Sequence, residues 1–240
     1  MPVSRKRIEA NLDRIRANIA AACERVGRRP EDVRLVAVTK TVDLDTIKNL
    51  LDAGVTDLGE NRVQQLIPRA DELDAALRRR QNPQPAVQWH MIGHLQRNKV
   101  RPTLALNAVI HSMDSLRLAE EISNCAERLE TVPDVMLQVN CSGEGQKFGA
   151  AVGAAAYLAE LISTLKHIRL VGLMTMAPLA DDPAKARPTF VRLREIFEEM
   201  RHEKIGGDAF RHLSMGMSQD YAVAVEEGAT ILRIGTAIFE

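Results

Sequence analysis

The chain has 240 residues, of which 45% are hydrophobic, and its 32 lysine and arginine residues balance 32 aspartate and glutamate residues. This length and composition are sufficient for one globular domain with a full core. A net charge of zero and an aromatic content of 3% argue against a nucleic-acid-binding protein and a polybasic membrane-binding protein.

Helices and strands alternate through the first half of the chain. Apolar residues at three- and four-residue steps predict an amphipathic helix over residues 4–26. Residues 34–40 contain four consecutive apolar residues, Leu35 to Val38, and predict a strand that is buried on both faces. A helix capped by Asp43 follows. The next expected elements are a strand at 55–59, a helix at 63–77, a loop at 78–86, a strand at 87–92 and a helix at 95–106.

The same alternation continues through the second half. A Gly-rich loop follows the strand expected at 135–139 and precedes an Ala-rich helix. The final strand is expected to end at Gly235. In order, we expect a strand at 108–111, a helix at 115–129, a strand at 135–139, a helix at 150–165, a strand at 170–175, a helix at 183–201, a strand at 212–214, a helix at 221–226 and a strand at 231–234.

This pattern favours a closed α/β barrel. About eight strands, each separated from the next by one helix, indicate parallel pairing with right-handed crossovers. Eight such units in a chain of this length match a (β/α)8 TIM barrel, which usually has about 250 residues. No GxGxxG motif follows the first strand, which disfavours an open dinucleotide-binding sheet. We predict a single-domain TIM barrel over residues 1–240, with the extra N-terminal helix covering part of its wall.

Residues at the strand ends are the candidates for a functional site, because a barrel builds its active face from the loops that follow its strands. Two hydroxyl-glycine clusters, Ser214 with Gly216 and Gly235 with Thr236, follow the last two strands, where barrels commonly bind phosphate. Lys40 ends the first strand across from them. A lysine opposite a phosphate site suits pyridoxal 5′-phosphate bound as a Schiff base, and equally suits a phosphosugar lysine aldolase.

Other polar residues near strand ends give weaker signals. His90, His94 and His111 lack the spacing of a zinc motif, so no metal site is predicted. Glu60 could act as a general base, but a solvated loop carboxylate is the favoured interpretation. The cysteines Cys23, Cys125 and Cys141 form no CxxC pair, no apolar run reaches membrane-spanning length, and no secretion signal opens the sequence. We therefore expect a soluble cytoplasmic protein.

Several motifs resemble those of the pyridoxal phosphate homeostasis proteins. These blocks occur in order from about residue 34 to the end, so the resemblance covers most of the chain. The family is similar to the barrel domain of alanine racemase without its second, β domain. The motifs are Val38-Thr39-Lys40, Gly59-Glu60-Asn61, Trp89-His90-Met91-Ile92-Gly93-His94, Ser214-Met215-Gly216-Met217-Ser218 and Arg233-Ile234-Gly235-Thr236.

The resemblance implies a cofactor site for pyridoxal 5′-phosphate (PLP). By this resemblance Lys40 is the Schiff-base lysine, Asn61 borders the cofactor and Arg233 faces the pyridine nitrogen. The residues that it implies for the phosphate are Ser214, Gly235 and Thr236.

Two considerations favour a cofactor carrier over a racemase. Racemisation needs a base on each face of the substrate carbon, and racemase relatives draw the second base, a tyrosine, from the second domain of the other subunit. Tyr157 and Tyr221 are instead expected on outer helices. Arginine stays protonated below about pH 12, so Arg233 would keep the pyridine nitrogen unprotonated and the ring a weak electron sink.

We therefore expect a protein of intracellular PLP homeostasis that holds and releases the cofactor, and we assign no catalytic residue. A single-domain PLP-dependent racemase with weak turnover and a Schiff-base aldolase are the alternatives. The expected partners are the small-molecule cofactor and apo-forms of PLP enzymes, without nucleic acid or membrane, and the expected state is a monomer.

Overall fold

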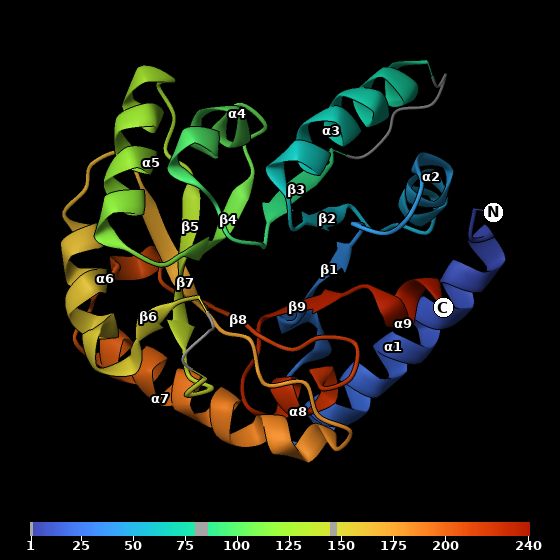
Figure 1. The fold of residues 1–240 in the computed structure, drawn as a ribbon. Helices are drawn as coiled ribbons and strands as arrows, with labels where there is room; N and C mark the ends of the chain where they lie inside the picture. The colour runs from blue at the N-terminus through green and yellow to red at the C-terminus, as the bar shows by residue number, and fades with distance from the viewer. Residues whose placement is uncertain (1, 80–85, 145–147) are drawn as a thin grey trace.

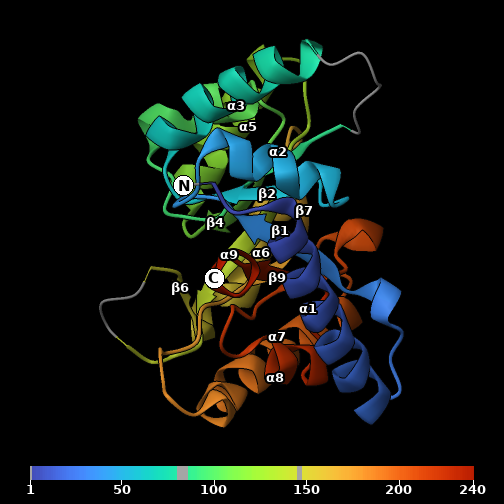
Figure 2. The same cartoon turned by 90° about the vertical axis from the view of Figure 1, so that its right-hand side faces the viewer.

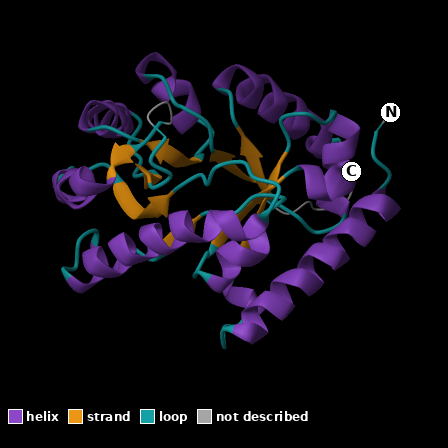
Figure 3. Ribbon diagram, turned by 60° about the horizontal axis from the view of Figure 1, so that its bottom comes forward, coloured by secondary structure: helices purple, strands orange, loops and turns teal. Residues whose placement is uncertain are grey.

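The computed structural model describes residues 2–79, 86–144 and 148–240, and it confirms the predicted barrel. All strand pairings are parallel, and the first and last strands pair with each other. Figure 3 shows the strands at the centre of the molecule with helices around them. The order around the barrel is β1 (Arg34–Val38), β2 (Asp57–Glu60), β3 (Gln88–Met91), β4 (Val109–Met113), β5 (Asp134–Asn140), β7 (Arg169–Met174), β8 (His212–Ser214) and β9 (Ile231–Ile234).

The helices follow the predicted alternation, and their caps explain where several begin. The Ser4 hydroxyl accepts the N–H of Arg7 at the first helix, and the Asp43 carboxylate accepts the N–H of Thr46 at 2.8 Å at the second. The helices are α1 (Arg5–Arg25), α2 (Leu44–Asp52), α3 (Val63–Arg78), α4 (Val100–Leu104), α5 (Leu116–Arg128), α6 (Ala155–Ser163), α7 (Arg187–His202), α8 (Tyr221–Glu226) and α9 (Thr236–Phe239).

Three segments differ from the predictions. The helix expected at 95–106 is a 3₁₀ turn at Arg97–Lys99 followed by the short α4. The helix expected at 150–165 begins five residues later, because Ala150–Ala151 form strand β6 beside β5 and a 3₁₀ turn follows. Helix α9 was not expected at all. Most of the loop predicted at 78–86 lies outside the described residues.

Helix α1 covers the barrel wall, as the sequence predicts. It packs against α2, α8 and α9, and Figures 1 and 2 show it on the outside of the barrel, beside α8 and α9. Its buried face carries Ile8, Leu12 and Ile15, and each such side chain contributes about 1.5–3 kcal/mol when it leaves water. Asn11 Nδ2 donates to the carbonyl oxygen of Ile238 at 2.9 Å. This contact ties α1 to the short helix that follows β9.

The inside of the barrel has its own small apolar cluster, separate from the core between strands and helices. Its buried members are Val36, Met136, Val171, Met174 and Ile231. Because side chains alternate along a strand, the inward positions beyond this cluster open toward the carboxyl ends of the strands. In the described part of the chain, no helix has the length and apolar character needed to cross a membrane.

Candidate functional site

A cavity of about 750 Å³ opens at the carboxyl ends of the strands. Its size is in the range of sites for small organic ligands. Five of the six residues that the sequence assigned to the cofactor line it: Lys40, Asn61, Arg233, Gly235 and Thr236. The fold thus brings together side chains that are far apart in the chain.

Lys40 follows β1, and hydrogen bonds from β2 and α3 hold the main chain in front of it. The N–H of Thr39 donates to the carbonyl oxygen of Gly59 at 3.0 Å, and its hydroxyl donates to Glu60 Oε1 at 2.6 Å. Arg69 Nη1 also donates to the carbonyl oxygen of Thr39. The main chain before Lys40 is therefore fixed, while the side chain of Lys40 enters the cavity.

Glu60 is not the solvated loop carboxylate that the sequence suggested. Its side chain is fully buried at the end of β2, and Arg69 Nη1 lies 3.1 Å from Oε1. Burial raises the pKa of Glu60, while the hydrogen bond from Thr39 and the charges of Arg69 and Lys40 act in the opposite direction. Because Glu60 does not line the cavity, it supports the strand end that carries Lys40.

Arg233 presents a fixed positive charge to the cavity. Its side chain is almost fully buried, with Nη1 donating to Ser214 Oγ at 2.7 Å and Nη2 to the carbonyl oxygen of Thr175 at 2.9 Å. Burial lowers the pKa of Arg233 to about 10, and the charge of Asp220 opposes that shift. Arg233 therefore stays protonated at neutral pH.

Ser214 is not among the described residues that line the cavity, and its predicted contact with the phosphate stays a prediction. It is fully buried, and its hydroxyl meets Arg233 on one side and His111 Nδ1 at 2.8 Å on the other. Ser218, four residues later, lines the cavity together with Gly235 and Thr236. The hydroxyl groups at this wall of the cavity are those of Ser218 and Thr236, whereas Ser214 binds Arg233 beneath it.

Gly216 makes the turn between these two serines possible. Its φ of +95° lies in the region that favours glycine, and a Cβ there would come within 2.6 Å of Ala224 Cβ. In the same turn Asp220 accepts the N–H of Met217 at 2.6 Å. Burial raises the pKa of Asp220, whereas the hydrogen bond from the N–H of Met217 and the charge of Arg233 act in the opposite direction.

Asn61 provides an unpaired hydrogen-bond acceptor at the cavity. Its Oδ1 is buried and has no hydrogen-bond partner within the described part of the chain. A Cβ on Gly93 would lie 2.1 Å from the carbonyl oxygen of Asn61, so only glycine allows the β3 loop to pack against this residue. Because an unpaired buried acceptor is costly, Asn61 fits a ligand that brings a hydroxyl or ammonium donor.

Aromatic and apolar side chains form the rim of the cavity. His94 stacks on Phe148 with ring centroids 4.2 Å apart, and its Nδ1 lies 3.5 Å from Asp114 Oδ2. Leu179 is 83% exposed and Met176 is 39% exposed. Such a rim suits a flat, partly apolar ligand, and it leaves apolar surface beside the entrance.

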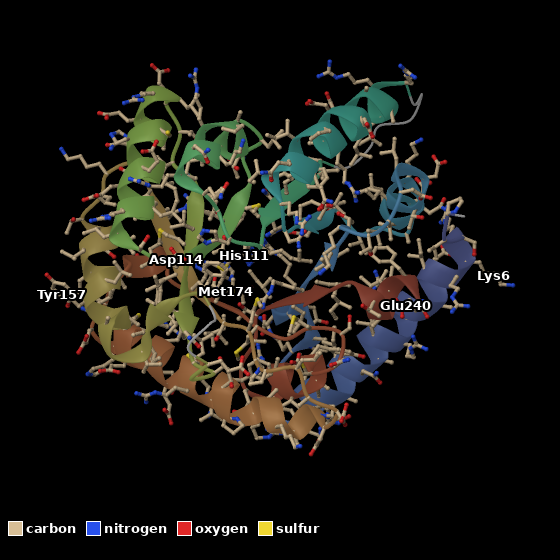
Figure 4. All side chains as sticks on the ribbon, viewed as in Figure 1. Lys6, His111, Asp114, Tyr157, Met174 and Glu240 are labelled. Atoms are coloured by element: carbon tan, nitrogen blue, oxygen red, sulfur yellow. The ribbon has the colours of Figure 1, made fainter. Side chains whose placement is uncertain are left out.

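The two tyrosines lie on outer helices, as expected from the sequence. Tyr157 is on the exposed face of α6, where Figure 4 shows it at the edge of the molecule. The Tyr221 hydroxyl accepts from Asn18 Nδ2 at 2.8 Å, between α8 and α1. Neither tyrosine is among the described residues that line the cavity. Within the described ranges, no group of three or more metal-ligating side chains is arranged to hold a metal ion.

The sequence interpretation missed a buried polar cluster beneath Arg233. His111 lies inside the barrel, as Figure 4 shows, and contacts Ser214 and His90, and His90 contacts Asp57. Burial lowers the pKa of His111 well below its usual value. Polar residues at inward positions of successive strands were the available signal.

Comparison with known proteins gives consistent results. Residues 10–240 match the family model described as alanine racemase, N-terminal domain. The pyridoxal phosphate homeostasis protein of Aquifex aeolicus is 39% identical over 228 residues, which is 95% of each chain. The protein of the same name from Pseudomonas aeruginosa is 37% identical over 235 residues, or 97% of this chain and 94% of the relative.

Solved structures show the same likeness. PipY of Synechococcus elongatus with PLP bound has a TM-score of 0.81 and 31% identity, and the match covers 97% of this chain and 100% of PipY. Alanine racemase of Clostridium difficile has a TM-score of 0.73 at 15% identity, and the match covers 99% of this chain but 57% of the racemase. The second comparison concerns the fold alone.

Proposed function

Because the chain belongs to the alanine racemase N-terminal domain family and, within it, to the pyridoxal phosphate homeostasis proteins, we propose that its cavity binds PLP reversibly. The protein then serves PLP homeostasis by holding and releasing the cofactor, without substantial catalytic turnover. The observation that carries this proposal is the convergence of Lys40, Arg233 and Thr236 on one cavity.

Each cavity residue has a role that fits its placement. When bound, PLP supplies an aldehyde that combines with a lysine amine and an aromatic ring that withdraws electrons. Lys40 provides the amine, and Arg233 directs its charged guanidinium toward the ring nitrogen. Asn61 Oδ1 accepts from the ligand.

The phosphate lies, in this proposal, at the wall formed after β8 and β9. Thr236 and Ser218 supply hydroxyl groups there, and Gly235 allows close approach of the main chain. The buried positive charge of Arg233 adds attraction. Ser214 takes part only through its hydrogen bond to Arg233.

Two features support a carrier over a racemase. No tyrosine is among the described cavity residues, so the second base used by racemase relatives has no counterpart there. Arg233 keeps its proton at neutral pH even after burial lowers its pKa, so it donates to the ring nitrogen and supplies no proton to it.

We also propose that the protein acts as a cytoplasmic monomer and passes PLP to apo-forms of PLP enzymes. Every group assigned to the cofactor comes from a single chain, so a second subunit is not needed to complete the site. The free cysteines Cys23, Cys125 and Cys141 agree with a reducing compartment. The exposed apolar side chains Leu179 and Phe148 beside the entrance suit transient contact with an acceptor protein.

A transfer experiment tests the function. The purified protein should bind PLP, and the loaded protein should absorb light near the border of the visible and ultraviolet ranges. The loaded protein should also restore activity to an apo-transaminase. Incubation with a panel of L-amino acids should give almost no racemised or transaminated product. A protein that leaves PLP free in equilibrium dialysis would refute the proposal, and a phosphosugar trapped on the protein would support an aldolase instead.

The phosphate wall gives a separate prediction. Thr236→Val keeps the shape of the side chain but removes a hydrogen bond to a charged group, a loss of about 1.5–3 kcal/mol, or about ten- to hundredfold in PLP affinity. Pyridoxal, which has no phosphate, should bind the wild type weakly and lose little more in the variant. Fluorescence titration with both ligands measures this.

Thr164→Val is the matched control, because it makes the same chemical change on an exposed residue at the end of α6. It should leave both affinities unchanged. Equal losses of PLP and pyridoxal in Thr236→Val would show that Thr236 does not contact the phosphate.

A further inference from the structure

A chain of hydrogen bonds crosses the barrel interior beneath the cavity. Arg233 Nη1 donates to Ser214 Oγ at 2.7 Å, and Ser214 Oγ lies 2.8 Å from His111 Nδ1. His111 Nε2 lies 2.9 Å from His90 Nδ1, and His90 Nε2 lies 2.8 Å from Asp57 Oδ1. The step from Ser214 on β8 to His111 on β4 spans the barrel, because these strands are not neighbours in the sheet.

This chain of hydrogen bonds lies in a low-dielectric environment. His90, His111 and Ser214 are fully buried, and apolar side chains including Val36 and Met174 fill the barrel interior. In such surroundings each hydrogen bond polarises the next, and an unpaired polar group is expensive. A continuous arrangement is therefore favoured over a broken one.

The identity of the two end groups fixes the direction of the chain. The carboxylate of Asp57 only accepts, so His90 carries its proton on Nε2 and, as a neutral ring, accepts at Nδ1. His111 must then donate from Nε2 and accept at Nδ1. The Ser214 hydroxyl can donate to His111 because its oxygen already accepts from Arg233. Every hydrogen bond thus points from the guanidinium to the carboxylate.

We propose that Asp57, His90, His111 and Ser214 are positioning residues that hold Arg233 charged and aimed at the cavity by linking it to a carboxylate at the opposite end of the barrel. Asp57 is the first residue of β2, its side chain is 23% exposed, and its Oδ1 lies 3.8 Å from Arg34 Nη1. The direct acceptors of Arg233, Ser214 Oγ and the Thr175 carbonyl, carry no charge.

This inference rests on the proposed function only in assigning Arg233 to the ring nitrogen of PLP. The tautomers can be measured directly. In ¹⁵N NMR spectra of the labelled protein, with and without added PLP, His90 and His111 should both be neutral with the proton on Nε2 at pH 7. A doubly protonated ring, or a proton on Nδ1 of either histidine, would contradict the proposed direction of these hydrogen bonds.

Substitutions along the chain test its effect on Arg233. His111→Gln keeps an acceptor for Ser214 and a donor for His90, whereas His111→Met fills the space and breaks the chain. His111→Met should weaken PLP binding about ten- to hundredfold, the usual effect of removing partners that orient ligand-binding groups, while His111→Gln should retain most of the affinity. Asp57→Asn, at the half-buried end, should cost about three- to tenfold.

His212→Gln is the matched control. His212 also lies on a barrel strand, but it takes no part in this chain of hydrogen bonds. It should alter PLP affinity by less than about twofold. The guanidinium N–H signals of Arg233 provide a second readout that does not depend on PLP. They should exchange with water at least about tenfold faster in His111→Met and Asp57→Asn than in the wild type.

The outcomes separate this inference from the proposed function. A wild type that fails to bind PLP would refute the function, while the tautomers and the exchange of Arg233 would still decide whether the chain exists and holds the guanidinium. Wild-type PLP affinity together with wild-type exchange of the Arg233 guanidinium in Asp57→Asn, or in a folded His111→Met, would overturn the inference.

Discussion

Replacing Lys40 by alanine is expected to abolish the covalent attachment of PLP. The side chain of Lys40 enters the cavity from a strand end that Thr39, Glu60 and Arg69 hold in place. Treatment of the wild type with PLP and borohydride should fix the cofactor to a single peptide that contains Lys40, as read by mass spectrometry. The Lys40→Ala variant should give no labelled peptide and no absorption from bound cofactor.

The fold should survive this change, because an exposed lysine facing a cavity contributes little to the core. The free energy of unfolding should stay within about 0.5 kcal/mol of the wild type without PLP. Lys99→Ala is the matched control, since Lys99 lines a smaller hollow beside Asn61 and His94. It should keep both the label and the absorption. A labelled peptide that excludes Lys40 would refute the assignment.

Replacing Arg233 by glutamate is expected to increase exchange of the α-proton of a bound amino acid. The wild-type guanidinium remains protonated at neutral pH, and in the proposed site it would donate to the ring nitrogen and leave that nitrogen without a proton. A carboxyl group at this place would stabilise a protonated nitrogen, and the ring would then withdraw electrons more strongly. Deuterium incorporation into L-amino acids in heavy water, compared between Arg233→Glu and the wild type, measures the effect.

This comparison requires that the variant still binds PLP, which the absorption spectrum establishes first. Arg211→Glu makes the same change of charge at an exposed residue before β8 and should leave the exchange rate at the wild-type level. A wild type that exchanges protons at a few per second or more, the range of ordinary enzymes, would contradict the carrier proposal and support a racemase.

Most of the fold could be predicted because hydrophobic periodicity and caps are local properties of the sequence. The cap at Asp43 and the buried strand at 34–38 follow directly from neighbouring residues. The sequence failed to predict elements whose formation depends on tertiary contacts. Helix α9 has four residues, too few for a periodic pattern, and α1 holds it through the bond from Asn11 to Ile238. Strand β6 has two residues and exists only because β5 is beside it.

In the cavity, too, some residues could be placed from the sequence and others could not. Lys40, Arg233 and Thr236 could be placed because strand ends in a barrel meet on one face. The position of Ser214 could not be predicted, because choosing between the cavity and the barrel interior requires the pleat of β8, which a three-residue strand does not reveal. The sequence presents His111 and His90 only as possible metal ligands, since nothing local indicates that their partners are Ser214 and Asp57.

The pairing of β1 with β9 determines when a ribosome-bound chain can first hold its ligand. Lys40 is translated early, but Arg233 and Thr236 emerge only after nearly all other elements, and the closing hydrogen bonds join residues 34–37 to 231–234. Joining segments so distant in sequence carries a loop-closure entropy that earlier contacts must offset. A nascent chain therefore has no complete cavity until β9 is available, and a ligand of this cavity can stabilise only the finished barrel.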